Sequence, residues 1–381
     1  MRELIFRLAR PMMRLLGRDE RGAIGVLIAV LIAGGVLLGM GALALDVGRL
    51  YQNRAELQNG ADAAALAVAD SCALGTCTTG IAGQYATGNA SKLTGNNAAV
   101  DLVCGSGTGM AACPGGGTGA IYDCPANPSA GTNYVDVHTS TLTASGSTLL
   151  PPIFARTLLG NRGYAGTNVK ACAQAEWGAP TSATTIAFTI SACSWYVYTN
   201  NGTNFAQPPP YPPNTPPAPS YDHILFEHGS QGSKTTGCPP FQPSGQDAPG
   251  NFGWTSDSGN CSTFINNGSY GGNTGASASG DCQTVIQNAY TNRTLVFLPV
   301  YSAISGTGSN VTYTLLGFAA FVITGYHITG SFKANDWLNP ANNCKGNNFC
   351  IDGYFTQGLI PSTGGLGGGN GLGASIVKLT G

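Results

Sequence analysis

The most distinctive pattern in this 381-residue chain is an uninterrupted apolar run near its N-terminus. Residues 23–45 contain no charged side chain. At about 1.5 Å per residue they would form a helix of roughly 34 Å, long enough to cross a bilayer core of about 30 Å. The arginine-rich segment 1–22 precedes the run, and the positive-inside rule keeps such a segment in the cytoplasm. The pattern therefore predicts a single-pass membrane protein whose remaining residues lie beyond the membrane.

A cleaved signal peptide is the alternative interpretation of this run. Ala42-Leu43-Ala44 has the small-residue pattern of a cleavage site. The apolar run is, however, longer than the roughly 7 to 15 residues typical of a signal peptide, and the helical pattern continues past the site. We therefore favour an uncleaved anchor.

Helical periodicity extends beyond the apolar run, with no proline between residue 45 and Cys72. Hydrophobic positions recur at steps of three and four from Leu43 to Val68, with Arg54 as the one interruption. This spacing predicts one continuous helix of about 47 residues, whose outer half is rich in alanine. Small side chains let another helix or a sheet approach closely, and lipid-facing spacing is the alternative for the glycines. We expect helix packing, including self-association, at Gly35, Gly39, Ala61, Ala64 and Ala65.

After this helix the hydrophobic positions fall into short segments separated by Gly, Pro and Asn. Residues 104–133 have the composition of a loop, and three cysteines lie within it. Segments rich in β-branched and aromatic residues predict strands at 185–191, 194–198, 295–301, 311–315, 318–328 and 375–379. The proline-rich segment 208–219 predicts an extended spacer between them.

The predicted fold class is a membrane-anchored α+β protein with a disulfide-braced β-rich C-terminal domain of sandwich or barrel-like form. Four parts follow from the pattern: a basic cytoplasmic segment 1–22, a transmembrane helix 23–45, a helix extension with a small α+β domain 46–178, and an extracytoplasmic β-rich domain 179–381.

Composition narrows the possible functions. Only 9% of the residues are charged, against about 25% in ordinary soluble domains. A net charge of -1 lacks the basic excess that binds phosphate backbones, so no nucleic-acid partner is expected. All twelve cysteines follow the apolar run, and their even number predicts disulfides. The two short-range candidate pairs are Cys72–Cys77 and Cys344–Cys350.

The N-terminal region contains ALDVGRLY at residues 44–51 and LQNGADAAALA at residues 57–67, after a basic head that ends in DERGA. These segments resemble the TadE/TadG-like proteins of tight-adherence (Flp) pilus assembly. The resemblance extends over about residues 18–177 and includes expected strands around 134–140 and 167–175. The positions that carry the motif are Asp46, Gly48, Arg49, Tyr51, Asn59, Ala61 and Asp62.

The resemblance implies a bacterial cell-envelope protein in the cytoplasmic membrane. Its implied partners are the lipid bilayer and other Tad pilus or secretion proteins. Two family features are missing from this chain. The D-x-S-x-S metal motif of larger TadG proteins does not occur, and a prepilin-type cut after Gly22 would leave Leu27 where relatives carry Glu.

No segment has the spacing of a catalytic, metal or cofactor motif. Residues 223–228 read H-x-x-x-E-H, one residue longer than the H-x-x-E-H pattern of zinc proteases. We therefore expect a non-catalytic scaffold or minor structural subunit of a Tad-type pilus-assembly or secretion machine, without a cofactor. The alternative is a membrane-tethered envelope binding module or hydrolase that engages a surface polymer through Trp195, Trp254 and Trp337. Core packing is favoured for Trp195, because large aromatic side chains are highly buried on average.

Overall fold

The computed structural model describes residues 20–90, 95–114, 123–154, 166–211, 215–227, 238, 252–266, 268–273, 279–306, 310–342, 344, 348–361, 364–367 and 371–380. Residues 1–19 of the basic segment, 115–122 of the expected loop, 212–214 of the proline-rich segment and His228 lie outside this description. The chain forms two compact units that alternate along the sequence. Unit 1 comprises Met1–Gly60, Ala86–Asp101 and Thr139–Ala171, and unit 2 comprises Ala61–Tyr85, Leu102–His138 and Cys172–Gly381.

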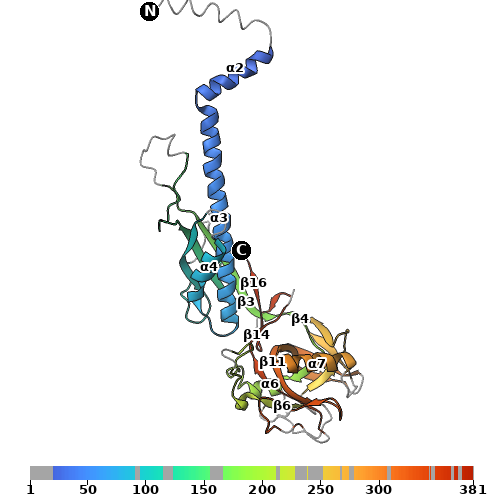
Figure 1. The fold of residues 1–381 in the computed structure, drawn as a ribbon. Helices are drawn as coiled ribbons and strands as arrows, with labels where there is room; N and C mark the ends of the chain where they lie inside the picture. Colours follow the sequence, from blue (N-terminus) through green and yellow to red (C-terminus); the bar gives the residue numbers. More distant parts are fainter. Residues whose placement is uncertain are drawn as a thin grey trace, which may run out of the picture. The chain divides into compact units, whose positions relative to one another are not determined.

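The helical elements lie mainly in the N-terminal quarter of the chain (Figure 1). The helices are α2 (Glu20–Ala33), α3 (Val36–Ala73), η1 (Thr79–Ile81), α4 (Ala82–Ala90), α6 (Ala192–Tyr198), η2 (Pro219–Tyr221) and α7 (Gly280–Asn292). The strands are β1 (Asn97–Gly105), β2 (Asn133–Leu142), β3 (Lys170–Pro180), β4 (Ser182–Ile186), β5 (Phe188–Ser191), β6 (His223–Phe226), β7 (Phe252–Thr255), β8 (Ser262–Asn266), β9 (Ser269–Asn273), β10 (Leu295–Ser305), β11 (Thr312–His327), β12 (Lys333–Ala334), β13 (Cys350–Thr356), β14 (Gly358–Leu359), β15 (Leu366–Gly367) and β16 (Ala374–Leu379).

The apolar run near the N-terminus is divided between two helices. Gly34 and Gly35 form a turn between α2 and α3, and Gly35 has a φ of +71°, a conformation that only glycine adopts without steric cost. The 14 residues of α2 extend about 21 Å, less than a bilayer core requires. Within the described residues, no helix combines the length and the apolar character needed to cross a membrane. The predicted transmembrane helix 23–45, the membrane-anchored fold class and the single-pass localisation are therefore wrong.

The first three strands of the chain and its last three strands form a six-stranded sheet. Its order is β1-β2-β3-β16-β14, and β15 pairs with β3. Strands expected at 134–140 and 167–175 are present as β2 and β3, and β3 continues to Pro180. The expected loop at 104–133 contains no helix, and no named strand beyond the end of β1 and the start of β2, in its described part.

The larger sheet of unit 2 has the order β10-β5-β7-β9-β11-β13-β6, and β10 also pairs with β11. This extra pairing closes a ring of five strands. β11 is central to it, because its C-terminal half is fully buried and pairs with β10 and β13. Phe188, Phe252 and Trp254 pack edge to face beside β11 residues in one core cluster. The C-terminal region is thus β-rich, as its composition predicts.

One predicted strand is a helix. Residues 194–198 belong to α6, whose first turn is capped by the Ser191 side chain accepting a hydrogen bond from the Ser194 N–H at 3.0 Å. A serine cap in this position stabilises a helix over the extended conformation that the apolar residues favour alone. Trp195 is buried in this helix, and its indole N–H donates to the Leu372 carbonyl at 2.7 Å. The prediction of core packing for Trp195 is confirmed.

All twelve cysteines are paired, so the expected disulfide framework is confirmed. The structure joins Cys72 to Cys77 and Cys344 to Cys350, the two short-range candidates. The other four pairs are Cys104–Cys113, Cys124–Cys172, Cys193–Cys238 and Cys261–Cys282.

Candidate functional site

Asp46 and Arg49, two of the motif positions, hold the loop that follows β2. They lie three residues apart on α3 and therefore on one face of the helix. The Asp46 carboxylate accepts hydrogen bonds from the backbone N–H groups of Ile153 at 3.0 Å and Phe154 at 3.2 Å. The Arg49 guanidinium donates to the Pro151 carbonyl at 3.2 Å. The two charged residues thus fix an apolar loop more than 100 positions away in the sequence.

The same face of α3 continues inward with polar residues that the sequence analysis did not single out. Asn53 is 1% exposed, and its side-chain oxygen accepts a hydrogen bond from the Thr141 hydroxyl at 2.7 Å. The Thr139 hydroxyl donates to the Leu57 carbonyl at 3.3 Å, so β2 lies against this face. A signal was present: Asp46, Arg49 and Asn53 recur at helical spacing.

In the first half of α3, the expected apolar stripe faces solvent and not the interior of the protein. Leu43 is 61% exposed, and Val47 is 39% exposed. There, the face of α3 that packs against other segments carries the hydrogen-bonded residues Asp46, Arg49 and Asn53. A search for apolar periodicity does not detect such a face. From Leu57 onward the expected stripe and the buried face coincide.

The alanines expected to pack are buried inside the chain itself. Ala61, Ala64 and Ala65 each have an exposed fraction of 0%. Nearby, a Cβ at position 60 would lie 2.7 Å from the Ala86 carbonyl, so α3 and α4 approach closely only because residue 60 is glycine. Gly35 and Gly39, near the start of α3, have no such close neighbour, because a Cβ on either residue would meet no heavy atom within 4 Å.

The remaining motif positions lie on or near the surface of α3. A Cβ at Gly48 would meet open space, Tyr51 is 68% exposed and Asn59 is exposed. Asp62 is partly buried. The structure therefore brings Asp46 and Arg49 together at one loop and does not gather all motif positions in one site.

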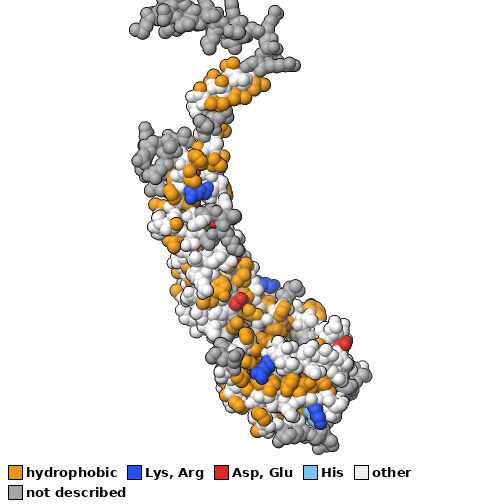
Figure 2. Space-filling model, in the orientation of Figure 1, with side chains coloured by type: hydrophobic (Ala, Val, Ile, Leu, Met, Phe, Trp, Pro, Cys, Tyr) orange, Lys and Arg blue, Asp and Glu red, His pale blue; other side chains and the backbone are white. Residues whose placement is uncertain are grey.

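Apolar side chains are exposed along α2 and the first half of α3, where Figure 2 shows them gathered over the helices. Four of them recur at steps of three and four on α3: Met40, Leu43, Val47 and Tyr51. We call the exposed set the apolar helix surface, and it comprises Ile24, Val26, Leu27, Ile28, Val30, Ile32, Met40, Leu43, Leu45, Val47 and Tyr51. Contiguous exposed apolar patches of this kind mark interaction sites.

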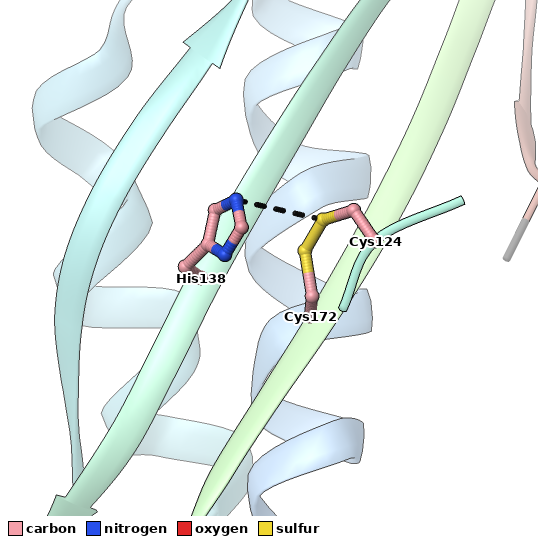
Figure 3. Close-up of side chains that lie close together, drawn as sticks. All are labelled: Cys124, His138 and Cys172. Atoms are coloured by element: carbon pink, nitrogen blue, oxygen red, sulfur yellow. Dashed lines mark hydrogen bonds between the residues drawn. A yellow bond between two sulfur atoms is a disulfide. The ribbon is translucent and has the colours of Figure 1, made fainter. Parts of the chain in front are cut away.

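A histidine lies beside sulfur atoms in unit 2, in an arrangement that superficially resembles a metal centre. His138 Nε2 on β2 lies 3.7 Å from the Cys124 sulfur, and Cys172 on β3 completes the group (Figure 3). The two sulfurs are bonded to each other, so neither is available as the thiolate that binds zinc. The neighbouring set Cys104, Asp136 and His138 has the same defect, because Cys104 is bonded to Cys113.

The carboxylate of the H-x-x-x-E-H segment is part of the core. Glu227 is 4% exposed, and its Oε1 accepts a hydrogen bond from the Trp254 indole N–H at 2.7 Å. Burial raises the pKa of Glu227, and the bond from Trp254 lowers it by a smaller amount. Trp254 is 5% exposed, so neither Trp195 nor Trp254 forms the exposed aromatic surface that a polymer-binding module requires.

Residues 22–71 match the model of the Flp pilus-assembly TadE/G-like family. No curated protein and no solved structure was found to be similar to the chain. The matched residues contain the Asp46–Arg49 pair, all of the apolar helix surface and the buried alanines. The match confirms the resemblance in the N-terminal region and supports involvement of the protein in pilus assembly.

Proposed function

We propose that this protein is a non-catalytic component of a Tad/Flp-type pilus-assembly machine, a scaffold or minor structural subunit that packs against apolar helices of other Tad proteins. The observation that carries the proposal is the apolar helix surface, which lies entirely within the family-matched residues 22–71. Met40, Leu43 and Val47 recur at the spacing of anchors that a helix lays against a partner.

The Asp46–Arg49 pair supports the same role. It holds the loop of Ile153 and Phe154, whose side chains are 55% and 42% exposed, beside the exposed stretch of α3. Asp46 and Arg49 thereby hold Ile153 and Phe154, from a distant part of the chain, next to the apolar helix surface and enlarge it. A catalytic role for these charges finds no support, because their partners are backbone groups of a loop.

The proposal is tested with Leu43→Glu and Val47→Glu in a strain that lacks the wild-type gene. Both side chains are exposed, so the free energy of unfolding should change by no more than about 0.5 kcal/mol. A charge on the contact surface should nevertheless abolish surface pili and crosslinking to Tad partners. Phe264→Glu is the matched control, since Phe264 on β8 is 60% exposed but lies outside the family-matched region.

Normal piliation of the folded Leu43→Glu and Val47→Glu strains would contradict the proposal. Substitutions of Ala61 or Ala64 by Leu are less informative here. Both alanines are core residues of the chain, so overpacking would damage folding as well as any contact with a partner.

A further inference from the structure

Three aspartates that are far apart in the sequence come together in unit 2. Asp222 directly precedes β6, Asp336 follows β12, and Asp352 lies within β13. Strand pairing causes this arrangement, because Asp352 is opposite Ile224 of β6 on one side and Gly325 of β11 on the other. One carboxylate oxygen from each aspartate lies within 4.8 Å of the others. All three are buried, with exposed fractions of 6%, 7% and 2%.

The hydrogen bonds to these carboxylates do not balance their charge. Asp222 Oδ1 accepts from the Thr324 hydroxyl at 2.6 Å, and its Oδ2 accepts from the Asn342 side-chain amide. Asp336 Oδ1 accepts from two backbone N–H groups at 2.8 and 2.9 Å. None of these hydrogen-bond donors carries a positive charge, and Lys333 is a cationic side chain that lines the adjoining hollow.

Three polar atoms around the cluster have no hydrogen-bond partner within the described part of the chain. They are Asp336 Oδ2, Asp352 Oδ1 and His327 Nδ1. Each belongs to a side chain that is more than nine-tenths buried. His327 lies outside the carboxylate cluster, yet it lines the same hollow of about 430 Å³ as Asp336 and Asp352. Buried polar groups normally have partners, so these unpaired atoms around one hollow point to a ligand.

The backbone is shaped to admit the carboxylates. A Cβ at position 325 would lie 2.9 Å from Asp352 Oδ2 and 2.9 Å from the Cα of Asp336. The pairing of β11 with β13 also shifts register between Ile323 and Gly325. Glycine at this position therefore leaves the space that both acidic residues occupy.

Burial raises the pKa of Asp222 to about 9, and a side-chain hydrogen bond with Asp336 and the charges of Asp336 and Asp352 act in the same direction. Burial and the charge of Asp336 raise the pKa of Asp352 to about 7. A bound cation reverses this effect, because it favours the charged form of each carboxylate.

We propose that Asp222, Asp336 and Asp352 bind a divalent cation, and that this cation is Ca²⁺. The three aspartates supply only oxygen ligands, which hard cations such as Ca²⁺ prefer. Oxygens that share one Ca²⁺ at about 2.4 Å lie no more than about 4.8 Å apart, and the three carboxylate oxygens meet this limit. The hollow offers space for water ligands, and Ca²⁺ tolerates the irregular geometry better than Mg²⁺ does.

The test is calorimetric titration of the full, disulfide-bonded chain with CaCl₂ after removal of metal by EDTA. We expect saturable binding with a Kd between about 10⁻⁶ and 10⁻³ M. Asp336→Asn and Asp352→Asn should each weaken binding at least about tenfold, a loss that even outer-shell changes produce at metal sites. Asp281→Asn, an exposed residue in the first turn of α7, is the matched control and should bind as the wild type does.

Thermal unfolding gives a second measurement that also reports whether the variants fold. Ca²⁺ should raise the midpoint of the wild type and of Asp281→Asn but not of Asp336→Asn. Without metal, Asp336→Asn should be at least as stable as the wild type, because the carboxylate that disfavours the charged forms of Asp222 and Asp352 is removed.

If the Asn variants do not fold, Tb³⁺ bound to the wild type decides the question. Tyr326 lines the hollow and should sensitise Tb³⁺ luminescence that Ca²⁺ then displaces. The proposal is overturned if the wild type shows neither heat of binding nor a shifted midpoint at about 10 mM Ca²⁺. Unchanged Ca²⁺ affinity in folded Asn variants, or no displaceable Tb³⁺ signal, would overturn it equally.

Discussion

At the residue scale, Glu227 and Trp254 form a buried polar pair in the core of unit 2. The indole N–H of Trp254 donates to Glu227 Oε1, while Oε2 has no partner among the described residues. A carboxylate buried in this way is costly when it is charged, which is why burial raises its pKa. The pair therefore links the stability of the fold to pH.

The sign of this pH dependence follows from the raised pKa. Glu227 in the folded chain holds its proton at a pH where the unfolded chain, with the ordinary value of 4.5, has lost it. The stability that the neutral form contributes is complete below pH 4.5 and is lost as pH rises toward the raised pKa. Glu227→Gln keeps an oxygen for Trp254 and removes the proton equilibrium, so this part of the pH dependence should disappear.

Urea unfolding between pH 4 and pH 8 measures the effect. Glu227→Ala is the matched comparison, because it leaves the Trp254 N–H unpaired and should be about 1–3 kcal/mol less stable than Glu227→Gln at every pH. An identical pH profile for Glu227→Gln and the wild type would mean that this carboxylate does not titrate in the range.

At the element scale, the α3 helix is correctly predicted over most of its length, but its buried face is not. Apolar periodicity places Leu43 and Val47 inward, whereas hydrogen bonds that Asp46 and Asn53 accept from distant groups turn the polar face inward. A hydrogen-bonded polar side chain can be buried at little cost, and periodicity of apolar residues does not register it. The partners of these bonds are about 90 to 110 positions away in sequence.

The close approach of α3 and α4 yields a prediction for Gly60. Gly60→Ala places a methyl group 2.7 Å from the Ala86 carbonyl oxygen and 3.1 Å from the Ala90 side chain, so the helices must separate. We expect a loss of about 1–3 kcal/mol in the free energy of unfolding, measured by chemical denaturation.

Gly48→Ala is the control on the same helix. Its Cβ meets nothing within 4 Å, and alanine is the better helix former by about 1 kcal/mol, so stability should stay equal or rise. The close-approach explanation fails if Gly60→Ala is as stable as Gly48→Ala.

At the scale of the whole molecule, disulfides offset the flexibility of a chain with 56 glycines. The bond between Cys261 and Cys282 joins the residue before β8 to α7 and closes 21 residues. Closing a loop of that length stabilises a fold by about 3 kcal/mol, and the five-residue separation of Cys72 and Cys77 corresponds to about 2 kcal/mol.

Paired alanine substitutions should reproduce this order. Replacing both Cys261 and Cys282 should cost more stability than replacing both Cys72 and Cys77, as measured by denaturant midpoints without reductant. As a control, alkylation of the native wild type should label no thiol until it is reduced. Labelling of the unreduced protein, or a reversed order of stabilities, would contradict the role assigned to the long-range bond.

The sequence by itself determined the features that depend on neighbouring residues. Helical spacing and alanine content specified the helix around residue 60, β-branched and aromatic runs specified β10 and β11, and the N-terminal motif specified the family region. Cysteines only a few positions apart were paired for the same reason. These features follow from local conformational preference and short loops.

Tertiary structure alone decided the rest. It determined the buried face of α3, the long-range disulfides and the meeting of Asp222, Asp336 and Asp352. The helix at residues 194–198 and the division of the apolar run have local causes that the sequence analysis missed, namely the Ser191 cap and the turn at Gly34 and Gly35. The buried face of α3, the long-range disulfides and the aspartate cluster share one physical reason. The free energy of each arrangement comes from partners far away along the chain, which no local pattern reveals.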